Sequence, residues 1–229
     1  MKDFLKPLGI ELTETQSNQF KQYFELLVSE NKKYNLTAIV DEEGVYYKHF
    51  YDSVTLIKSG LLKNNITLAD IGSGAGFPAI PIKIIRPDIK VTIIESQTKK
   101  ANFMNLVIDT LSLHNIKVVN ARAEDYAKVS RNTFDIVTAR AVAPLNILIE
   151  LCIPFVKVGG YFIPMKSTLL EKEIEASNHG IMILGSKIEN VISFELPLNM
   201  GERNLLLIKK HKDAKGYPRP YAQIKKKPL

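Results

Sequence analysis

The sequence predicts an α/β fold in which helices flank a mainly parallel β-sheet. Short runs rich in β-branched residues alternate with longer segments whose apolar residues recur at helical spacing, a pattern typical of parallel strands joined by right-handed crossovers. A glycine-rich loop follows the first of these strands and leads directly into a helix, as in sheets that bind nucleotides at their carboxyl edge. With 229 residues, 45% of them apolar, the chain can build one sizeable α/β domain with a small attachment.

The N-terminal part of the chain is predicted to be helical. Thr13 and Gln16 form a capping box, and apolar side chains then recur at helical spacing. A second helical region is expected through roughly Ile57. It contains His49 and Asp52, which are three residues apart and therefore lie on one face. A single His–Asp pair of this kind is more often structural than catalytic.

The rest of the chain is predicted to supply the sheet. Five strands are expected at 66–70, 90–95, 116–120, 134–139 and 161–165, with helices at 98–113 and 145–156. Gly159 and Gly160 are expected to turn the chain before the fifth strand. Two later apolar runs, at 191–196 and 204–208, are separated by a short segment with a glycine. They predict an antiparallel hairpin at the sheet edge.

The loop after the first strand has the form of a nucleotide cradle. Asp70 closes the strand, glycines alternate from Gly72 to Gly76, and Pro78 opens the next helix. Glycine permits positive φ angles and lets a ligand approach the backbone without meeting a Cβ, while the helix mouth presents N–H groups without helical partners. A dinucleotide fingerprint would need glycine where this chain has Phe77. The spacing G-x-G-x-G is the S-adenosylmethionine form of the loop, and a glycine-rich turn without a ligand is the alternative.

Charged residues stand at the carboxyl ends of the later strands, where ligands of such sheets bind. Glu95 closes the second strand, where a carboxylate can accept both ribose hydroxyls. Ala123 and Glu124 follow the third strand, where a backbone N–H and a carboxylate can read an adenine edge. Each acid alone could be a helix N-cap. Together with the glycine loop, they favour a cofactor that bears adenosine.

The composition excludes several other classes of site. Cys152 is the single cysteine, so an intramolecular disulfide and a thiolate-rich zinc site are excluded, and its apolar surroundings predict a small buried side chain in a reducing cytosol. No metal is expected. No apolar stretch is long enough to cross a membrane, and the N-terminus has charges where a signal peptide is apolar, so we expect a cytoplasmic protein.

The excess positive charge lies at the C-terminus. The chain has 31 Lys and Arg against 24 Asp and Glu, and residues 209–229 contain eight of the basic residues and a single acid. Tyr217 and Tyr221 interleave with these basic residues. This composition suits a polyanion, because phosphate contacts release counterions and aromatic faces stack on bases. A solvated end that only aids solubility is the alternative.

Several motifs in combination resemble the bacterial small-subunit rRNA guanine-N7 methyltransferases, also called glucose-inhibited division protein B. They are Asn35-Leu36-Thr37, His49-x-x-Asp52-Ser53, the loop from Asp70 to Pro81, Ala121-Arg122-Ala123-Glu124, Phe134-Asp135 with Ala139-Arg140-Ala141, and Met165-Lys166. The resemblance covers essentially the whole chain. It departs mildly from the family at Glu95, where many members have Asp, and at Ser167, where a glycine is common.

The resemblance implies a Rossmann-like S-adenosylmethionine-dependent methyltransferase fold with an N-terminal helical extension. It implies transfer of a methyl group from S-adenosylmethionine to N7 of a guanine in the decoding-region loop of 16S rRNA, with either the rRNA or the small ribosomal subunit as partner. The family pattern implies cofactor contacts at Gly72, Phe77, Ala123, Glu124 and Arg140. The strand-end and loop arguments add Asp70, Gly74 and Glu95 as cofactor-binding residues.

Guanine N7 chemistry agrees with the residues at the strand ends. The N7 atom has an in-plane lone pair, so in-line transfer needs positioning and no general base. Arg140 and Lys166 are the candidate catalytic residues, because cations can hold the guanine O6 edge or the adjacent phosphates. Simple salt bridges at the strand ends are the alternative for both.

We expect three parts and a monomer. Residues 1–60 form a helical extension packed on the core, residues 61–210 the methyltransferase domain, and residues 211–229 a basic tail. Two alternatives to the implied function stay open: an RNA-binding or ribosome-assembly factor that keeps the fold without catalysis, and a methyltransferase acting on a different RNA.

Overall fold

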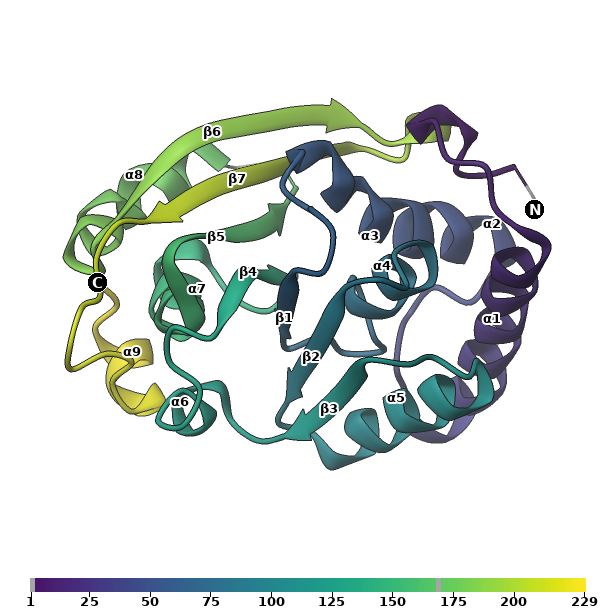
Figure 1. Cartoon of the computed structure of the whole chain (residues 1–229), viewed down its shortest axis with the longest axis horizontal. Helices are drawn as coiled ribbons and strands as arrows, with labels where there is room; N and C mark the ends of the chain where they lie inside the picture. Colours follow the sequence, from purple (N-terminus) through teal and green to yellow (C-terminus); the bar gives the residue numbers. More distant parts are fainter. Residues whose placement is uncertain (1–2, 168–169) are drawn as a thin grey trace.

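A seven-stranded sheet forms the centre of the molecule in the computed structural model, which describes residues 3–167 and 170–229 (Figure 1). The strands are β1 (Thr67–Ile71), β2 (Lys90–Glu95), β3 (Ile116–Asn120), β4 (Phe134–Arg140), β5 (Val156–Lys166), β6 (Ser186–Glu195) and β7 (Glu202–Lys210). Their order is β3-β2-β1-β4-β5-β7-β6. Strands β1 to β5 are parallel, and β7 runs antiparallel to both β5 and β6. The predicted parallel sheet and the hairpin at its edge are thus confirmed.

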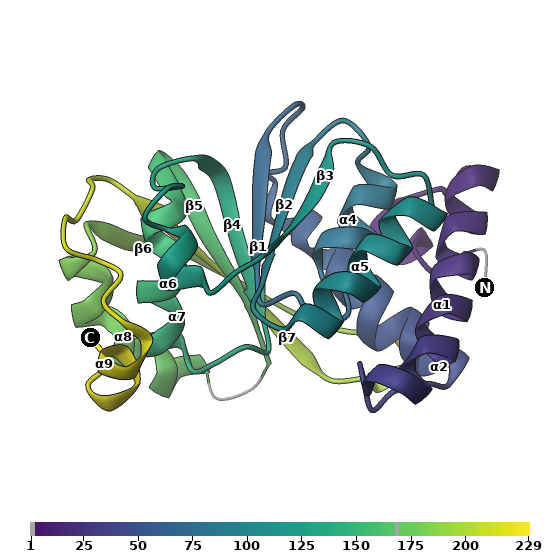
Figure 2. The same ribbon diagram turned by 90° about the horizontal axis from the view of Figure 1, so that it is seen from below.

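Helices cover both faces of the sheet (Figure 2). On one face lie α1 (Glu14–Tyr34), α2 (Glu42–Gly44), η2 (Val45–Tyr51), α3 (Asp52–Val54), η3 (Thr55–Ser59), α4 (Ala79–Ile85) and α5 (Thr98–Thr110). On the other lie α6 (Ala123–Tyr126), α7 (Leu145–Cys152), η4 (Ile153–Phe155), α8 (Leu170–Ile183) and α9 (Tyr221–Lys226). Short turns η1 (Lys6–Leu8) and η5 (Pro197–Asn199) complete the list. Each face has its own apolar core, as a doubly wound sheet requires.

The N-terminal helices pack directly on the sheet domain. The predicted capping box is present, because the Gln16 backbone N–H donates to Thr13 Oγ1 and the Gln16 side chain accepts from the Thr13 backbone. The Gln16 amide also donates to the Ile84 carbonyl of α4 at 2.9 Å. Farther along α1, the Tyr23 ring stacks on Phe50 with centroids 5.1 Å apart. The division of the chain at residues 60 and 210 stays a prediction.

The second helical region contains a π-helical stretch, η2, which the sequence did not indicate. Such widened turns occur frequently at functional sites. Here it carries His49, and Asp52 follows at the start of α3. Arg140, the last residue of β4, donates to the His49 carbonyl and to the Asp52 carboxylate, so both residues lie at the carboxyl end of this strand.

Two expectations about the last third of the chain were wrong or incomplete. Gly159 and Gly160 lie inside β5 and do not turn the chain before it. A Cβ on Gly160 would lie 2.6 Å from the Asp135 carbonyl oxygen, and the β4–β5 register shifts here, so the glycines allow a bulge in close backbone contact. Helix α8 was not predicted. Cys152 is fully buried, as predicted, and no helix in the described ranges is long and apolar enough to cross a membrane.

Candidate functional site

Asp70 stabilises the glycine loop through hydrogen bonds to both ends of the segment. This carboxylate is fully buried and accepts hydrogen bonds from the Ser73 hydroxyl and from the Ala79 backbone N–H at the start of α4. Burial raises the pKa of Asp70 to about 7, although both hydrogen bonds act in the opposite direction. Its Oδ1 atom is buried without a hydrogen-bond partner among the described residues. Asp70 therefore supports the loop, and its direct contact with a cofactor stays a prediction.

Glu95 and Gly74 meet above the ends of β1 and β2. The Glu95 carboxylate is 4% exposed and accepts from the backbone N–H groups of Gly74 at 3.1 Å and Gln97 at 2.9 Å. One carboxylate thus fixes the loops after two neighbouring strands. The predicted proximity of the two residues is present, while the ribose contact of Glu95 is untested.

A cavity of about 140 Å³ opens beside the glycine loop, and we call it the glycine-loop cavity. Its lining comes from the segments after four parallel strands and from α7 and α9: Ile71, Gly72, Ile94, Ser96, Ala121, Arg122, Ala123, Glu124, Val142, Ala143, Leu151 and Tyr221. Three predicted cofactor residues, Gly72, Ala123 and Glu124, are therefore brought together. The volume is several times that of a water molecule and suits a flat group such as a nucleobase.

A second cavity, of about 370 Å³, lies beside the ends of β4 and β5, and we call it the basic cavity. It is lined by Ile39, Lys48, His49, Asp52, Arg140, Ala141, Met165, Lys166, Ser167, Glu173 and Arg203. Both predicted catalytic residues, Arg140 and Lys166, belong to it. Four Lys or Arg face two carboxylates in this lining, so the cavity is suited to an electronegative ligand.

Asp52 organises the arginines of the basic cavity. Its two carboxylate oxygens accept from Arg140 Nη1 at 3.0 Å and from Arg203 Nε at 3.1 Å. The Arg140 guanidinium also lies 5.1 Å from the centre of the Phe77 ring. Arg203 was not predicted, because nothing in the sequence near Gly201 shows that the hairpin brings it back to Asp52.

Lys166 is held between two partners. Its ammonium lies 2.7 Å from the Glu173 carboxylate of α8 and donates to the Ala143 carbonyl at 3.0 Å. Arg140 and Lys166 thus both make ion pairs, as the alternative reading expected. They also line the cavity, so the ion pairs do not exclude a role toward a ligand.

Phe77 packs in a stack of rings behind the glycine loop. The centroids of the Phe77 and His49 rings are 4.6 Å apart, and the two rings are nearly parallel. The Tyr23 ring also stacks on Phe77, with its centroid 5.5 Å from that of Phe77. The Phe77 ring is buried and lines neither cavity. Its predicted contact with the cofactor is not tested by this arrangement.

His49 is a neutral member of the same stack. Burial lowers the pKa of His49 to about 3, and the nearby Arg140 charge acts in the same direction. Its Nδ1 lies 3.2 Å from the Lys48 carbonyl, which can only accept, so Nδ1 carries the proton. Nε2 then accepts from the Thr37 hydroxyl at 2.8 Å. This contact joins two of the motifs that the sequence singled out.

The segment Arg140–Ala143 separates the two cavities. Arg140 and Ala141 line the basic cavity, while Val142 and Ala143 line the glycine-loop cavity. Ala141 has φ 55°, in the left-handed region that non-glycine residues rarely adopt. Such strain is retained mostly at functional sites.

The glycine loop fits an adenosine-bearing cofactor. Gly72 has φ 71°, and a Cβ added to it would lie 2.8 Å from the Val142 side chain, at the cavity wall. A Cβ on Gly74 would meet nothing within 4 Å, so the backbone there is open to a ligand. Gly72, Gly74, Ala123 and Glu124 could hold such a cofactor, and their contact with it stays a prediction. No cluster of residues suited to a metal ion occurs in the part of the chain that the structure describes.

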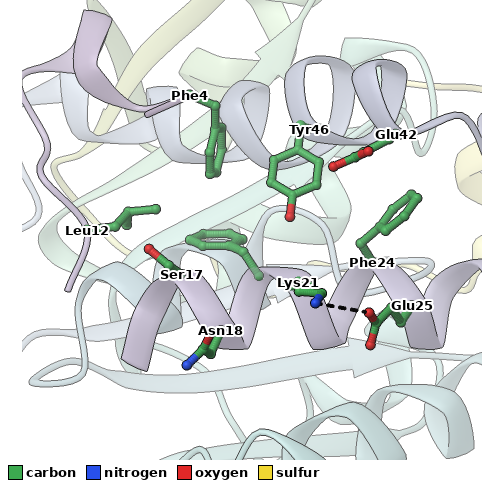
Figure 3. A pocket seen from close by; sticks show the side chains of 10 residues that line it. Phe4, Leu12, Ser17, Asn18, Lys21, Phe24, Glu25, Glu42 and Tyr46 are labelled. Atoms are coloured by element: carbon green, nitrogen blue, oxygen red, sulfur yellow. Dashed lines mark ion pairs between the residues drawn. The ribbon is translucent and has the colours of Figure 1, made fainter. Parts of the chain in front are cut away.

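A third cavity, of about 380 Å³, lies far from the strand ends, between α1 and the helical turns that begin at Glu42 (Figure 3). Aromatic side chains such as Phe24 and Tyr46 line it, and Lys21 pairs with Glu25 at its rim. It is separate from the predicted site residues.

Comparisons with known proteins agree with this geometry. Residues 16–206 match the family described as rRNA small subunit methyltransferase G. Ribosomal RNA small subunit methyltransferase G of Staphylococcus carnosus (strain TM300) is 48% identical over 229 residues, which are 98% of this chain and 95% of the relative. The protein of the same name from Staphylococcus aureus (strain Newman) is 45% identical over 98% of this chain and 95% of its own length.

Solved structures agree in fold. A SAM-dependent methyltransferase from Aquifex aeolicus has a TM-score of 0.55 at 20% identity, covering 79% of this chain and 97% of that one. M. jannaschii TYW2, solved in complex with AdoMet, has a TM-score of 0.54 at 17% identity, covering 69% of this chain and 74% of that one. The predicted methyltransferase fold is therefore confirmed.

Proposed function

Because the chain belongs to the rRNA small subunit methyltransferase G family, we propose that it transfers a methyl group from S-adenosylmethionine to N7 of a guanine in the decoding-region loop of 16S rRNA. The observation that carries the proposal is the pair of cavities on the two sides of Arg140–Ala143. One has the glycine cradle of an adenosine cofactor, and the other has the charge to receive an RNA base. The short segment between them brings donor and acceptor together.

The residues of the basic cavity act by positioning. S-adenosylmethionine supplies a sulfonium-bound methyl group when it is bound. Guanine N7 carries no proton that must be removed, so the chain has only to orient the base and keep its other atoms away from the methyl group. Arg140, whose guanidinium donates to Asp52, would donate to O6 of the guanine and leave the N7 lone pair free to attack the methyl group. Lys166, fixed by Glu173, is placed to hold O6 or a phosphate.

The charge of the basic cavity supports an RNA substrate. Lys48, Arg140, Lys166 and Arg203 outnumber Asp52 and Glu173 in the lining, and His49 adds no charge near neutral pH because its pKa is about 3. A cavity of about 370 Å³ has room for a base. Such a base must come from an unstacked loop, since the deep groove of an A-form helix is closed to side chains. We place the activity in the cytoplasm, with the protein acting as a monomer.

The test uses the full chain, labelled S-adenosylmethionine, and either 16S rRNA or small subunits from cells that lack the enzyme. Mass mapping and primer extension then locate the label. We expect one N7-methylguanine in the decoding-region loop, and comparing the two substrates shows which is used. Arg140→Gln should lose the transfer.

Arg86→Gln is a matched control. Arg86 is also partly buried and pairs with Asp88 at 2.7 Å, but it lies near the amino ends of β1 and β2. This variant should retain activity. A wild-type chain that binds S-adenosylmethionine but labels a different atom or a different RNA would contradict the proposal. Binding without any transfer would favour an assembly factor.

A further inference from the structure

The C-terminal segment reaches the glycine-loop cavity. After β7 the chain crosses the face that carries α7 and α8, and its last helix, α9, packs against α7 on that face (Figures 1 and 2). The Tyr221 side chain, at the first position of α9, is the one contribution that this segment makes to the described lining of the cavity. It stands opposite residues from the ends of the parallel strands, although it lies about a hundred positions after Glu124 in the sequence.

A buried ion pair fixes the segment in this position. Arg219 donates to the Glu150 carboxylate of α7 through its backbone N–H and Nε at 2.8 Å and through Nη2 at 2.6 Å. Glu150 is fully buried and the Arg219 side chain is 25% exposed, so the carboxylate of this three-point contact is shielded from water. Ile224, on the inner side of α9, is also fully buried. Tyr221 is thus placed between two anchored positions.

Arg122, which also lines the cavity, contacts the Tyr221 ring. The Arg122 guanidinium lies 5.8 Å from the centre of the ring, and Arg122 belongs to the segment after β3 that precedes Ala123 and Glu124. The ring is only half-buried, so part of its surface is free to contact a ligand in the cavity.

We propose that Tyr221 is a cofactor-binding residue that forms the outer wall of the adenine site. The adenine ring of S-adenosylmethionine would lie between the Tyr221 side chain and the residues that follow β1 to β4. Aromatic side chains suit this task because every base has a π-face on which they can stack. The inference rests on the cofactor part of the proposed function and does not depend on the RNA target.

A single tryptophan provides a direct readout. The chain contains no tryptophan, so Tyr221→Trp introduces one fluorophore at the proposed contact. Adenosine or S-adenosylmethionine should quench its emission in a saturable way, because the base stacks on the indole. Gln223→Trp is the matched control, since this position is exposed on the same helix, and its emission should not respond.

Calorimetry measures how much the Tyr221 contact contributes to cofactor affinity. Tyr221→Leu keeps an apolar side chain and removes the aromatic face. We expect it to weaken the binding of adenosine and of S-adenosylmethionine by a similar factor of about tenfold, within the range that base stacking provides. Tyr221→Phe should stay within about twofold of the wild type. Thermal unfolding of each variant checks that the chain is intact.

The outcomes separate this inference from the proposed function. If the wild type binds S-adenosylmethionine and the Tyr221→Trp emission does not change, Tyr221 is not part of the site. If Tyr221→Leu binds as tightly as the wild type or more tightly, the ring blocks the cavity and the inference is overturned. If the wild type binds no S-adenosylmethionine, the cofactor assignment itself fails. If cofactor binding is retained and only rRNA methylation is lost, the RNA target is wrong and the assignment of Tyr221 to the cofactor site stands.

Discussion

Replacing Asp52 with asparagine tests whether the ion pairs of the basic cavity position Arg140. The Asp52 side chain is 4% exposed, and its oxygens accept from Arg140 at 3.0 Å and from Arg203 at 3.1 Å. Asparagine has a single acceptor oxygen, so it keeps one bond and turns an amide donor toward the other guanidinium. Breaking a buried ion pair costs about 3–5 kcal/mol. Since one hydrogen bond remains, we expect the free energy of unfolding to fall by about 3 kcal/mol, measured by urea denaturation.

The same substitution separates positioning from charge. It removes a negative charge from the cavity, so the salt dependence of RNA binding should become steeper by up to about one unit of slope. The rate of methyl transfer at saturating RNA should nevertheless fall at least about tenfold, because Arg140 loses its orientation. Affinity for S-adenosylmethionine should fall by a smaller factor than the rate of transfer, since Asp52 itself does not line the glycine-loop cavity. Single-turnover kinetics and calorimetry measure these two quantities.

Glu43→Gln is the control for the change in net charge, because Glu43 is an exposed carboxylate in the helical turn that precedes η2. It should leave both stability and turnover at wild-type values. The reasoning is refuted if Asp52→Asn unfolds within about 0.5 kcal/mol of the wild type and transfers methyl groups at the wild-type rate.

Three further predictions address the cofactor loop, the buried titratable groups and the basic end of the chain. Gly72→Val should abolish S-adenosylmethionine binding in calorimetry, because φ 71° disfavours a branched side chain and the new Cβ points at the cavity wall; unchanged affinity would contradict the cradle. Burial raises the pKa of Asp70 from 3.8 to about 7, so its contribution to stability is present below pH 3.8 and lost as the pH rises through 7. Burial lowers the pKa of His49 from 6.5 to about 3, so its contribution is present above pH 6.5 and lost as the pH falls through 3. The two effects oppose each other between pH 4 and 6.5. Denaturation across this range should therefore show stability rising with pH in Asp70→Asn and falling with pH in His49→Gln, each by up to about 1.4 kcal/mol per pH unit; parallel curves for both variants and the wild type would argue against the shifts. Replacing Lys225 and Lys226, exposed in the last turn of α9, with glutamine should lower the salt slope of RNA binding by up to about two units and leave cofactor affinity unchanged; an unaltered slope would mean that this end of the chain does not contact RNA.

The sheet and the position of the site could be predicted because both follow from local patterns. Alternating strands and helices fix the direction of β1 to β5, and parallel strands bring their carboxyl ends to one edge. Gly72 and Glu124 therefore meet in one cavity, and Arg140 and Lys166 in the next. Once a residue was assigned to the end of a strand, its side-chain type was enough to predict the kind of ligand group that it could contact.

The contacts between distant segments could not be predicted in the same way. Asp52 and Arg203 are 151 residues apart, and only the return of the β6–β7 hairpin brings them together. The spacing of His49 and Asp52 placed them on one face, but it did not show that the face borders the site. Gly159 and Gly160 look like a turn because the sequence does not reveal the Asp135 backbone that packs against them.

The C-terminal segment shows how composition can mislead about structure. Its basic residues suggest an independent tail, yet Arg219 neutralises the fully buried Glu150 and Ile224 is part of the core. Removing residues 212–229 would leave the Glu150 carboxylate unpaired in the interior, a change that costs about 3–5 kcal/mol. It would also take Tyr221 away from the glycine-loop cavity. A truncation therefore changes stability, the cofactor site and RNA charge together, so only substitutions at exposed lysines can separate RNA binding from the other two.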